Sequence, residues 1–241
     1  MTQNNVYSTQ ESECEEKTLH EFSQQMDFFE ELADFFLKIM TEVNQGKDSP
    51  HTYDHQDMAV IFLTVKNFRS LTCLQNTIKF GYYSESLMIL RSVYESVHLC
   101  EYIMKNPDTA KMWWKCKRIP HSKVVKELLI PEAMQKMYGV LCDYTHSNVS
   151  SFIRDMSLES DFLSVQMSPV YRKKTAYFSI ILQLLLTVVA LKHYYEYFQK
   201  YSFIDFNSSH KETFEKMQDK YSNFMDEWFL YQEKTKKTEI I

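Results

Sequence analysis

Hydrophobic residues follow a helical spacing near both ends of the chain. From Leu19 to Val43 they fall alternately three and four positions apart, and the same spacing runs from Phe214 to Tyr231. This alternation puts the apolar side chains on one stripe of an α-helix, which must pack against a partner. The sequence therefore predicts long helices at both ends, which either pair with each other or mediate a homodimer.

Glycine and proline mark the limits of the helices between these segments. The chain holds three glycines and five prolines, far fewer than hairpins and tight turns require. We expect an all-α fold, a bundle of about six to eight helices with long N- and C-terminal helices. The inner helices are expected at 50–79, 84–104 and 111–118, from Pro120, from Pro131 through His146, and at 168–201.

The polarity of the two ends sets the expected domain boundaries. Residues 1–17 are polar and acidic, which predicts a disordered leader and argues against a secretory signal. A single all-helical domain is expected over 18–235, followed by a flexible tail at 236–241. The apolar run 176–191 is shorter than the about twenty residues of a membrane-spanning helix. It predicts a buried central helix, and no contact with a membrane is expected.

Charge and cysteine usage narrow the class of protein. The net charge of −5 and the isoelectric point near 5.9 argue against general coating of nucleic acid, although a local basic patch is compatible with them. The five cysteines are spread along the chain and form no C-x-x-C pair. Such a pattern is typical of reduced thiols, so a cytoplasmic location is expected.

The helix expected over 84–104 carries a polar strip on an otherwise apolar surface. With about 100° of rotation per residue, Arg91, Glu95, His98 and Tyr102 fall within roughly 60° of one another. One interpretation is a structural Arg91–Glu95 ion pair beside a histidine that only packs. The other is a site in which arginine holds a phosphate, histidine transfers a proton and glutamate orients them, with Tyr102 as a substrate contact. The sequence leaves both open.

A second group of polar residues follows the helix expected from Pro131. Tyr144, His146 and Asn148 stand where that helix ends and a loop begins. His146 can be stabilised there by the helix dipole, and Asn148 can serve as a turn residue. Alternatively, Tyr144 and His146 face Arg91 and complete its site, and His146 then replaces His98 as the proton-transfer group.

Residues 105–126 form a basic segment with a net charge of +6, so the rest of the chain sums to −11. Basic side chains interleaved with tryptophan suit phosphates and stacked bases. The residues expected to contact nucleic acid are Lys111, Lys115, Lys117, Arg118, Trp113 and Trp114. The other interpretation is a solvated face with ordinary lysines and with tryptophans in the core.

A metal site is the weakest of the chemical hypotheses. His51 and His55 lie one helical turn apart, a spacing that can bind a metal ion. Pro50 also marks a helix start, where Asp54 and Asp57 are favourable for the dipole. No further ligand set is evident, so no metal and no cofactor are expected.

Arg91 and His98, with six residues between them on one expected helix of an all-α chain, resemble the R-x(4–6)-H signature of the HEPN superfamily. Ser92 stands where its nucleases usually have Asn, Asp or His. Residues 60–200 also resemble a bacterial family of helical domains, in which an R-x-x-x-E helix precedes a tyrosine–histidine motif.

Many prokaryotic HEPN members are metal-independent ribonucleases of toxin–antitoxin and phage-defence systems, often with a composite site across a homodimer. The resemblance therefore implies an RNA-binding homodimer, with an antitoxin or another defence protein as a further partner. Arg91 would stabilise the phosphate, Glu95 would orient Arg91, and His98 or His146 would transfer the proton. Other HEPN members have lost catalysis, so the alternative is a non-catalytic module that binds or dimerises with a protein or nucleotide partner.

Overall fold

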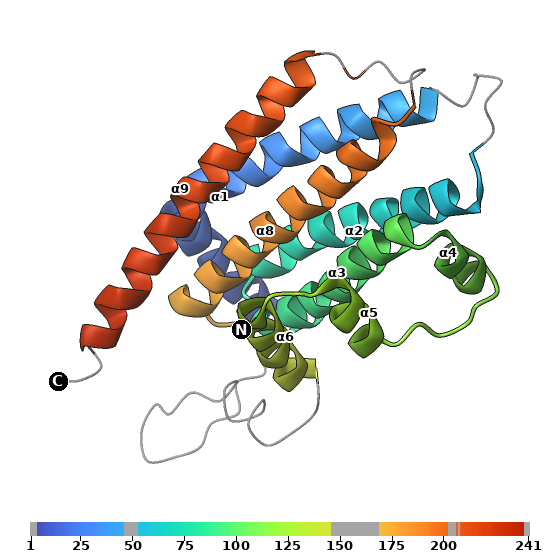
Figure 1. Cartoon of the computed structure of the whole chain (residues 1–241). Coiled ribbons are helices and arrows are strands. Elements are labelled where there is room, and N and C mark those ends of the chain that lie inside the picture. Colours follow the sequence, from blue (N-terminus) through green and yellow to red (C-terminus); the bar gives the residue numbers. More distant parts are fainter. Residues whose placement is uncertain (1–3, 46–52, 146–168, 202–205, 207, 239–241) are drawn as a thin grey trace.

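The computed structural model describes residues 4–45, 53–145, 169–201, 206 and 208–238, and this part of the chain contains α-helices and no strand. The helices are α1 (Asn4–Gln45), α2 (His55–Lys79), α3 (Tyr83–Lys105), α4 (Pro107–Trp114), α5 (His121–Leu128), α6 (Glu132–Thr145), α8 (Lys173–Phe198) and α9 (Ser208–Thr238). The predicted all-α bundle with long terminal helices is confirmed (Figure 1).

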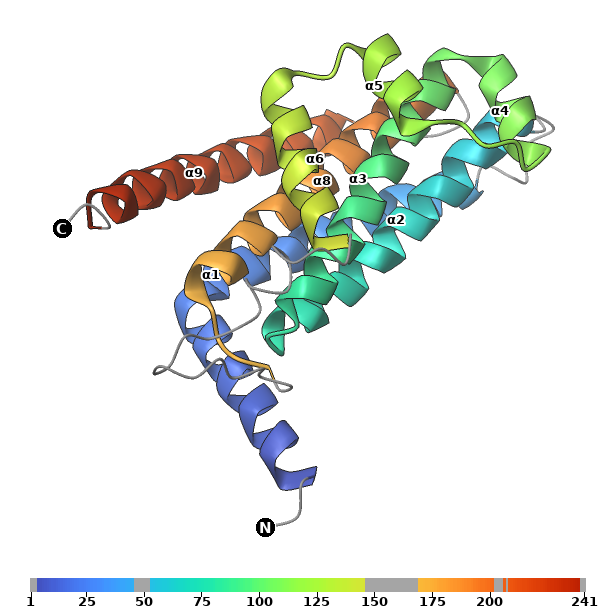
Figure 2. The same ribbon diagram turned by 90° about the horizontal axis from the view of Figure 1, so that it is seen from below.

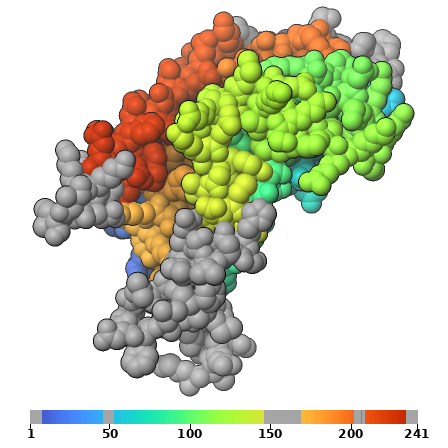
Figure 3. Space-filling model, turned by 60° about the horizontal axis from the view of Figure 1, so that its bottom comes forward, coloured from blue at the N-terminus to red at the C-terminus, as the bar shows by residue number. Residues whose placement is uncertain are grey.

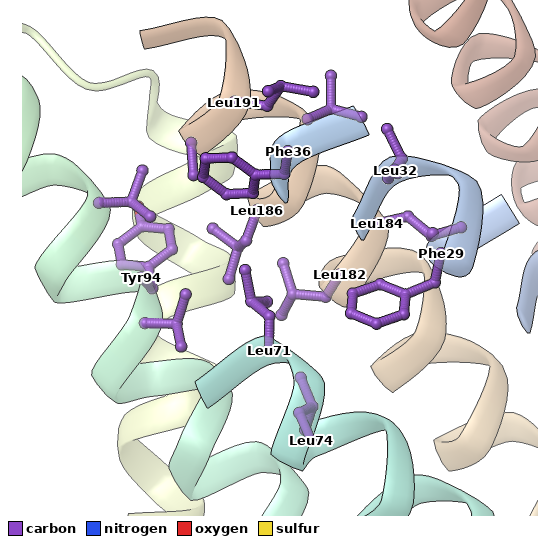
Figure 4. Packing of buried hydrophobic residues seen from close by; sticks show 14 of the residues in the cluster. Phe29, Leu32, Phe36, Leu71, Leu74, Tyr94, Leu182, Leu184, Leu186 and Leu191 are labelled. Carbon is purple, nitrogen blue, oxygen red and sulfur yellow. The ribbon is translucent and has the colours of Figure 1, made fainter. Parts of the chain in front are cut away.

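Helix α8 is the centre of the bundle. It contacts α1, α2, α3 and α9, and leucine, isoleucine and valine on several of its faces are buried. Figure 4 shows Leu182, Leu184 and Leu186 of α8 packed with aromatic and aliphatic side chains of α1, α2 and α3. Within the described residues α8 alone has the length and composition of a membrane-spanning helix, and most of it is buried by its neighbours.

Helix α1 begins much earlier than its polarity predicted. It starts at Asn4, so the expectation of a disordered leader over 1–17 is wrong for the residues that the structure describes. Cys14 and Thr18 are buried, and the Cys14 side chain fits against Gly81 in the turn between α2 and α3. Small buried side chains therefore anchor the polar first part of α1, and the helix bends at Phe22, where the backbone leaves helical geometry (Figure 2).

The two terminal helices contact each other across the surface of α8. The rings of Phe28 and Phe224 lie 5.5 Å apart, and Lys220 Nζ lies 2.8 Å from Glu31 Oε1. Their predicted pairing is thus present within one chain. Helix α9 continues to Thr238, so the tail expected over 236–241 is helical at 236–238, and residues 239–241 lie outside the described part.

Helix α2 begins at His55, five residues after Pro50, because Asp54 and Asp57 form a capping box there. The carboxylate of Asp57 is 1% exposed and also accepts hydrogen bonds from Tyr197 and Tyr201, near the end of α8. Lys200 Nζ lies 3.1 Å from the same carboxylate. One acidic side chain therefore joins the start of α2 to the end of α8.

Helices α4, α5 and α6 form an outer layer on the bundle (Figure 2). Helix α3 contacts α2 and α8 in the core and also contacts α4, α5 and α6. The polar strip of α3 is therefore covered in part by α5 and α6. Figure 3 shows residues 105–145 together on one face of the molecule, and this layer shapes the candidate site.

Candidate functional site

The Arg91–Glu95 ion pair expected from the helical spacing is present on α3. Arg91 Nε lies 3.1 Å from Glu95 Oε1, and the side chains are 24% and 37% exposed. A half-exposed pair of this kind stabilises a helix by only about 0.2–0.5 kcal/mol. The ion pair therefore contributes little to the stability of the fold, and a functional role depends on the residues around it.

Two residues of α6 hold this ion pair in position. The hydroxyl of Tyr138 donates a 2.6 Å hydrogen bond to Glu95 Oε1, the same oxygen that accepts from Arg91. Arg91 Nη1 donates to Thr145 Oγ1, and the guanidinium carbon lies 5.8 Å from the centroid of the Tyr138 ring. The hydrogen bond with Tyr138 and the nearby Glu95 raise the pKa of Arg91 against the effect of burial. The guanidinium is thus charged and fixed in orientation.

His98 does not share the setting of Arg91. It is 6% exposed, its ring packs 4.2 Å from that of Tyr94, and its Nδ1 has no hydrogen-bond partner among the described residues. Burial, together with the nearby His121, lowers the pKa of His98 to about 4. Helix periodicity puts His98 on the same side of α3 as Arg91, but His121 at the start of α5 packs against the His98 ring, with the ring centroids 5.9 Å apart. The structure thus gives no support to His98 as the proton-transfer group.

Tyr102 is also buried and lies away from Arg91. It is 3% exposed, and its hydroxyl donates a 2.8 Å hydrogen bond to Glu127 Oε2 at the end of α5. The predicted substrate contact of Tyr102 is therefore replaced by a contact that fastens α5 to α3.

A pocket of about 420 Å³ opens beside the Arg91–Glu95 pair and is called here the Arg91 pocket. Its charged side chains come from three parts of the chain: Lys66 from α2, Arg91 and Glu95 from α3, and Arg118 from the link between α4 and α5. Three cations against one carboxylate give the pocket a net positive charge. The other lining residues are Leu63, Ser92, Ser96, Leu99, Trp113, Ile119, His121, Val124 and Tyr138.

His121 is the histidine of this pocket, and the sequence interpretation missed it. It is the first residue of α5, directly after the N-cap Pro120, and its ring centroid lies 4.6 Å from that of Tyr138. Its Nε2 is buried and has no hydrogen-bond partner among the described residues. Burial lowers the pKa of His121, with Glu95 opposing the shift and Arg91 adding to it. The sequence signal that could have identified His121 is its position at a helix start, directly after Pro120 and within the basic segment 105–126.

The start of α5 adds to the positive potential of the pocket. Arg118, Ile119 and His121 line it, so the N-terminal end of the helix lies at its wall. The first N–H groups of a helix have no acceptor within the helix and carry the positive end of its dipole. The pocket thus combines guanidinium groups, an ammonium group and a helix start, all of which attract anions.

Only part of the predicted basic segment reaches the pocket. Arg118 and Trp113 line it, whereas Lys111 pairs with Asp108 at 3.0 Å on the exposed side of α4. Trp114 Nε1 donates a 2.8 Å hydrogen bond to the carbonyl oxygen of His55 and so fastens α4 to α2. Lys115 and Lys117 are exposed and lie outside the pocket lining.

The second polar group and the metal hypothesis fall largely outside the described residues. Tyr144 is half-buried, packs against the core and does not line the Arg91 pocket. His146, Asn148 and His51 lie outside the described residues. The ring of His55 contacts Trp114, and the described residues contain no group of three potential metal ligands.

No family model, curated protein or solved structure matches this chain. The resemblance to HEPN domains therefore remains a prediction that depends on the residues given above. What the geometry adds is a cationic pocket that holds Arg91, Glu95 and His121 together.

Proposed function

We propose that this protein is a HEPN-like RNA-binding protein, which holds a single-stranded RNA phosphate in the Arg91 pocket and cleaves the chain without a metal ion. The observation that supports this function is one titratable histidine, His121, in a pocket with Lys66, Arg91 and Arg118. Such a ribonuclease would act in the cytoplasm as a defence toxin, restrained by an antitoxin or another partner. Its homodimeric state is part of the same proposal.

Phosphate binding follows from the charges and from the fixed guanidinium. Glu95 and Thr145 hold Arg91 through Nε and Nη1, which orients the planar group toward a ligand. Arginine and lysine form charge-assisted hydrogen bonds to phosphate, and these are about twice as strong as neutral ones. Trp113 offers an aromatic surface in the same pocket, on which a base can stack.

His121 supplies the proton chemistry. Because burial lowers its pKa below 6.5, its ring is neutral at pH 7 and can accept a proton. In the proposed step His121 takes the proton of a ribose 2′-hydroxyl, and the 2′-oxygen forms a bond to phosphorus. The bond from phosphorus to the 5′-oxygen breaks, and that oxygen leaves with a proton from water. The products are a 2′,3′-cyclic phosphate and a 5′-hydroxyl end, and Arg91 stabilises the charge that develops on phosphorus.

Phosphate binding and proton transfer can be tested separately by measuring the binding and the cleavage of labelled single-stranded RNA in the presence of a chelator. Arg91→Lys keeps the charge but loses the fork, so we expect RNA affinity to fall about 10- to 100-fold. His121→Gln should keep most of the affinity and lower the cleavage rate by about 100-fold or more. Lys216→Ala on the exposed side of α9 is the control and should change neither.

The pH profile gives an independent check of the assignment to His121. Cleavage by the wild type should rise with pH and level off below 6.5, because the working form of His121 is neutral and its pKa is lowered. If folded His121→Gln cleaves as fast as the wild type, the assignment is wrong. His146→Gln then tests the remaining candidate.

A non-catalytic binding module is the second candidate, and the burial of His98 favours it. The described residues of the Arg91 pocket include one histidine, whereas cleavage of RNA benefits from both a base and an acid. A module of this kind would bind RNA or a nucleotide and leave it intact. Wild-type protein that binds RNA in chelator but produces no cyclic phosphate would establish the module and reject the nuclease.

A further inference from the structure

A second pocket lies on the other side of His121 and Tyr138. It has a volume of about 840 Å³ and lies between α5 and α6, which share one side of the bundle (Figure 2). His121 and Tyr138 line both pockets. The two cavities are therefore neighbours that share His121 and Tyr138 as a common wall.

The lining of this α5–α6 pocket differs in chemistry from that of the Arg91 pocket. Val125, Leu129 and Ile130 provide aliphatic surface, and the ring of Tyr138 stacks on that of Tyr94 at 5.3 Å, which fixes its plane. The polar side chains of the pocket are those of His121, Ser122, Lys126 and Gln135. Gln135 donates its side-chain N–H to the carbonyl oxygen of Ile130 at 2.7 Å, which holds the amide in place. A cavity with aliphatic walls, a fixed ring and an oriented amide suits a flat heterocycle.

Leu129 adds an observation that packing within the chain does not explain. It ends α5 in the left-handed conformation, with φ 54°, where glycine or asparagine usually stands. Its side chain is 85% exposed and lines the α5–α6 pocket. A leucine at this position is strained and is left in water. Both costs are understandable if its side chain covers a bound apolar group.

We propose that the α5–α6 pocket is a nucleobase subsite. It binds the base of the nucleotide whose 3′-phosphate is held in the Arg91 pocket. The inference deepens the proposed function and rests on it. The two pockets together match a nucleoside phosphate, because three cations and one carboxylate line one, aliphatic and aromatic side chains with a single cation, Lys126, line the other, and His121 lines both. The base packs between Leu129 and the ring of Tyr138, and Gln135 contacts its polar edge.

Calorimetric titration of the full chain in chelator tests the subsite with four probes: inorganic phosphate, the four nucleosides, their 3′-monophosphates and dodecyl phosphate. The 3′-nucleotides should bind more tightly than phosphate or nucleoside alone. Leu129→Gly should weaken nucleotide binding about 5- to 10-fold by removing apolar contact, and should leave phosphate binding unchanged. Glycine relieves the left-handed strain, so this variant should fold at least as well as the wild type. Val140→Ala, at an exposed valine of α6 outside the pocket, is the matched control.

The subsite is overturned if folded Leu129→Gly binds nucleotides as tightly as the wild type, or if dodecyl phosphate binds as tightly as the nucleotides. Failure of the proposed function gives different results. If inorganic phosphate does not bind and Arg91→Lys changes nothing, phosphate recognition is wrong. If nucleotides bind as expected and RNA stays intact, the subsite stands and cleavage is rejected.

Discussion

His98 and His121 both contact the ring of Tyr94, yet of the two only His121 lines the Arg91 pocket. Burial lowers the pKa of both histidines, and for His98 the value is about 4. His98 is therefore neutral in the folded protein over the physiological pH range. Its role lies in packing, and the dependence of stability on pH can reveal it.

Lowering the pH should destabilise the protein through His98. The unfolded chain protonates His98 below about pH 6.5, whereas the folded chain does so only near pH 4. The free energy of unfolding should therefore fall between pH 6.5 and 4, with a contribution of up to about 1.4 kcal/mol per pH unit. Urea unfolding of His98→Gln should show a shallower pH dependence than the wild type. Val97→Ala, a buried neighbour that does not titrate, should run parallel to the wild type, and equal slopes for all three would contradict the expectation.

Residue spacing predicted the part of the site that is local in sequence. Arg91 and Glu95 are one turn apart, so any helix brings them together. Spacing gives the side of the helix on which His98 lies, but whether another helix packs over that side depends on the tertiary structure. His121 and Lys66 reach the Arg91 pocket from α5 and α2, and no periodicity within α3 points to them. The residues that the sequence did not predict are those brought to the site by contacts between helices far apart in sequence.

At the scale of elements, Asp57 links two helices that are far apart in sequence, α2 and α8. Its carboxylate caps α2 and accepts from Tyr197 at 2.8 Å and Tyr201 at 2.6 Å. Asp57→Ala leaves a helix start and two tyrosine hydroxyls without their acceptor. We expect the free energy of unfolding to drop by roughly 2–4 kcal/mol in urea denaturation.

Two comparisons separate this link from a general effect of removing an acid. Tyr201→Phe removes one of the hydrogen bonds and should cost about 1 kcal/mol. Asp108→Ala removes the acid in the first turn of α4, where the side chain is 93% exposed, and should cost much less than Asp57→Ala. If Asp57→Ala and Asp108→Ala prove equally mild, the link between α2 and α8 is not important for stability.

Apolar periodicity predicted the helices themselves, and the errors lie at their ends. Helix α1 extends into a polar segment because Cys14 and Thr18 find buried positions, Cys14 against the turn at Gly81, which composition cannot show. Helix α2 begins at a capping box, although Pro50 offered an equally good local start. Helix ends depend on partners elsewhere in the fold, whereas helix interiors depend on repeated burial of one face.

At the scale of the whole molecule, positive charge is concentrated in an acidic protein. Residues 105–126 carry a net charge of +6, while the remaining residues sum to −11. Residues 105–145 lie together on one face, and the Arg91 pocket takes Arg118 and His121 from this region (Figure 3). Under the proposed function, an RNA strand would be attracted to that face and repelled by the acidic remainder of the protein.

Local charge, and not net charge, should therefore control RNA affinity. The double variant Lys115→Glu/Lys117→Glu removes two exposed cations of the link between α4 and α5. It should weaken RNA binding and should reduce by roughly 1–2 the slope of log affinity against log salt. Lys211→Glu/Lys216→Glu on α9 makes the same change in net charge at exposed positions, on the side of the bundle away from α4 (Figure 1). Because these lysines belong neither to the basic segment 105–126 nor to the lining of the Arg91 pocket, their double variant should keep nearly the full affinity and slope. If the two double variants weaken binding equally, RNA responds to the total charge of the protein and the basic face has no special role.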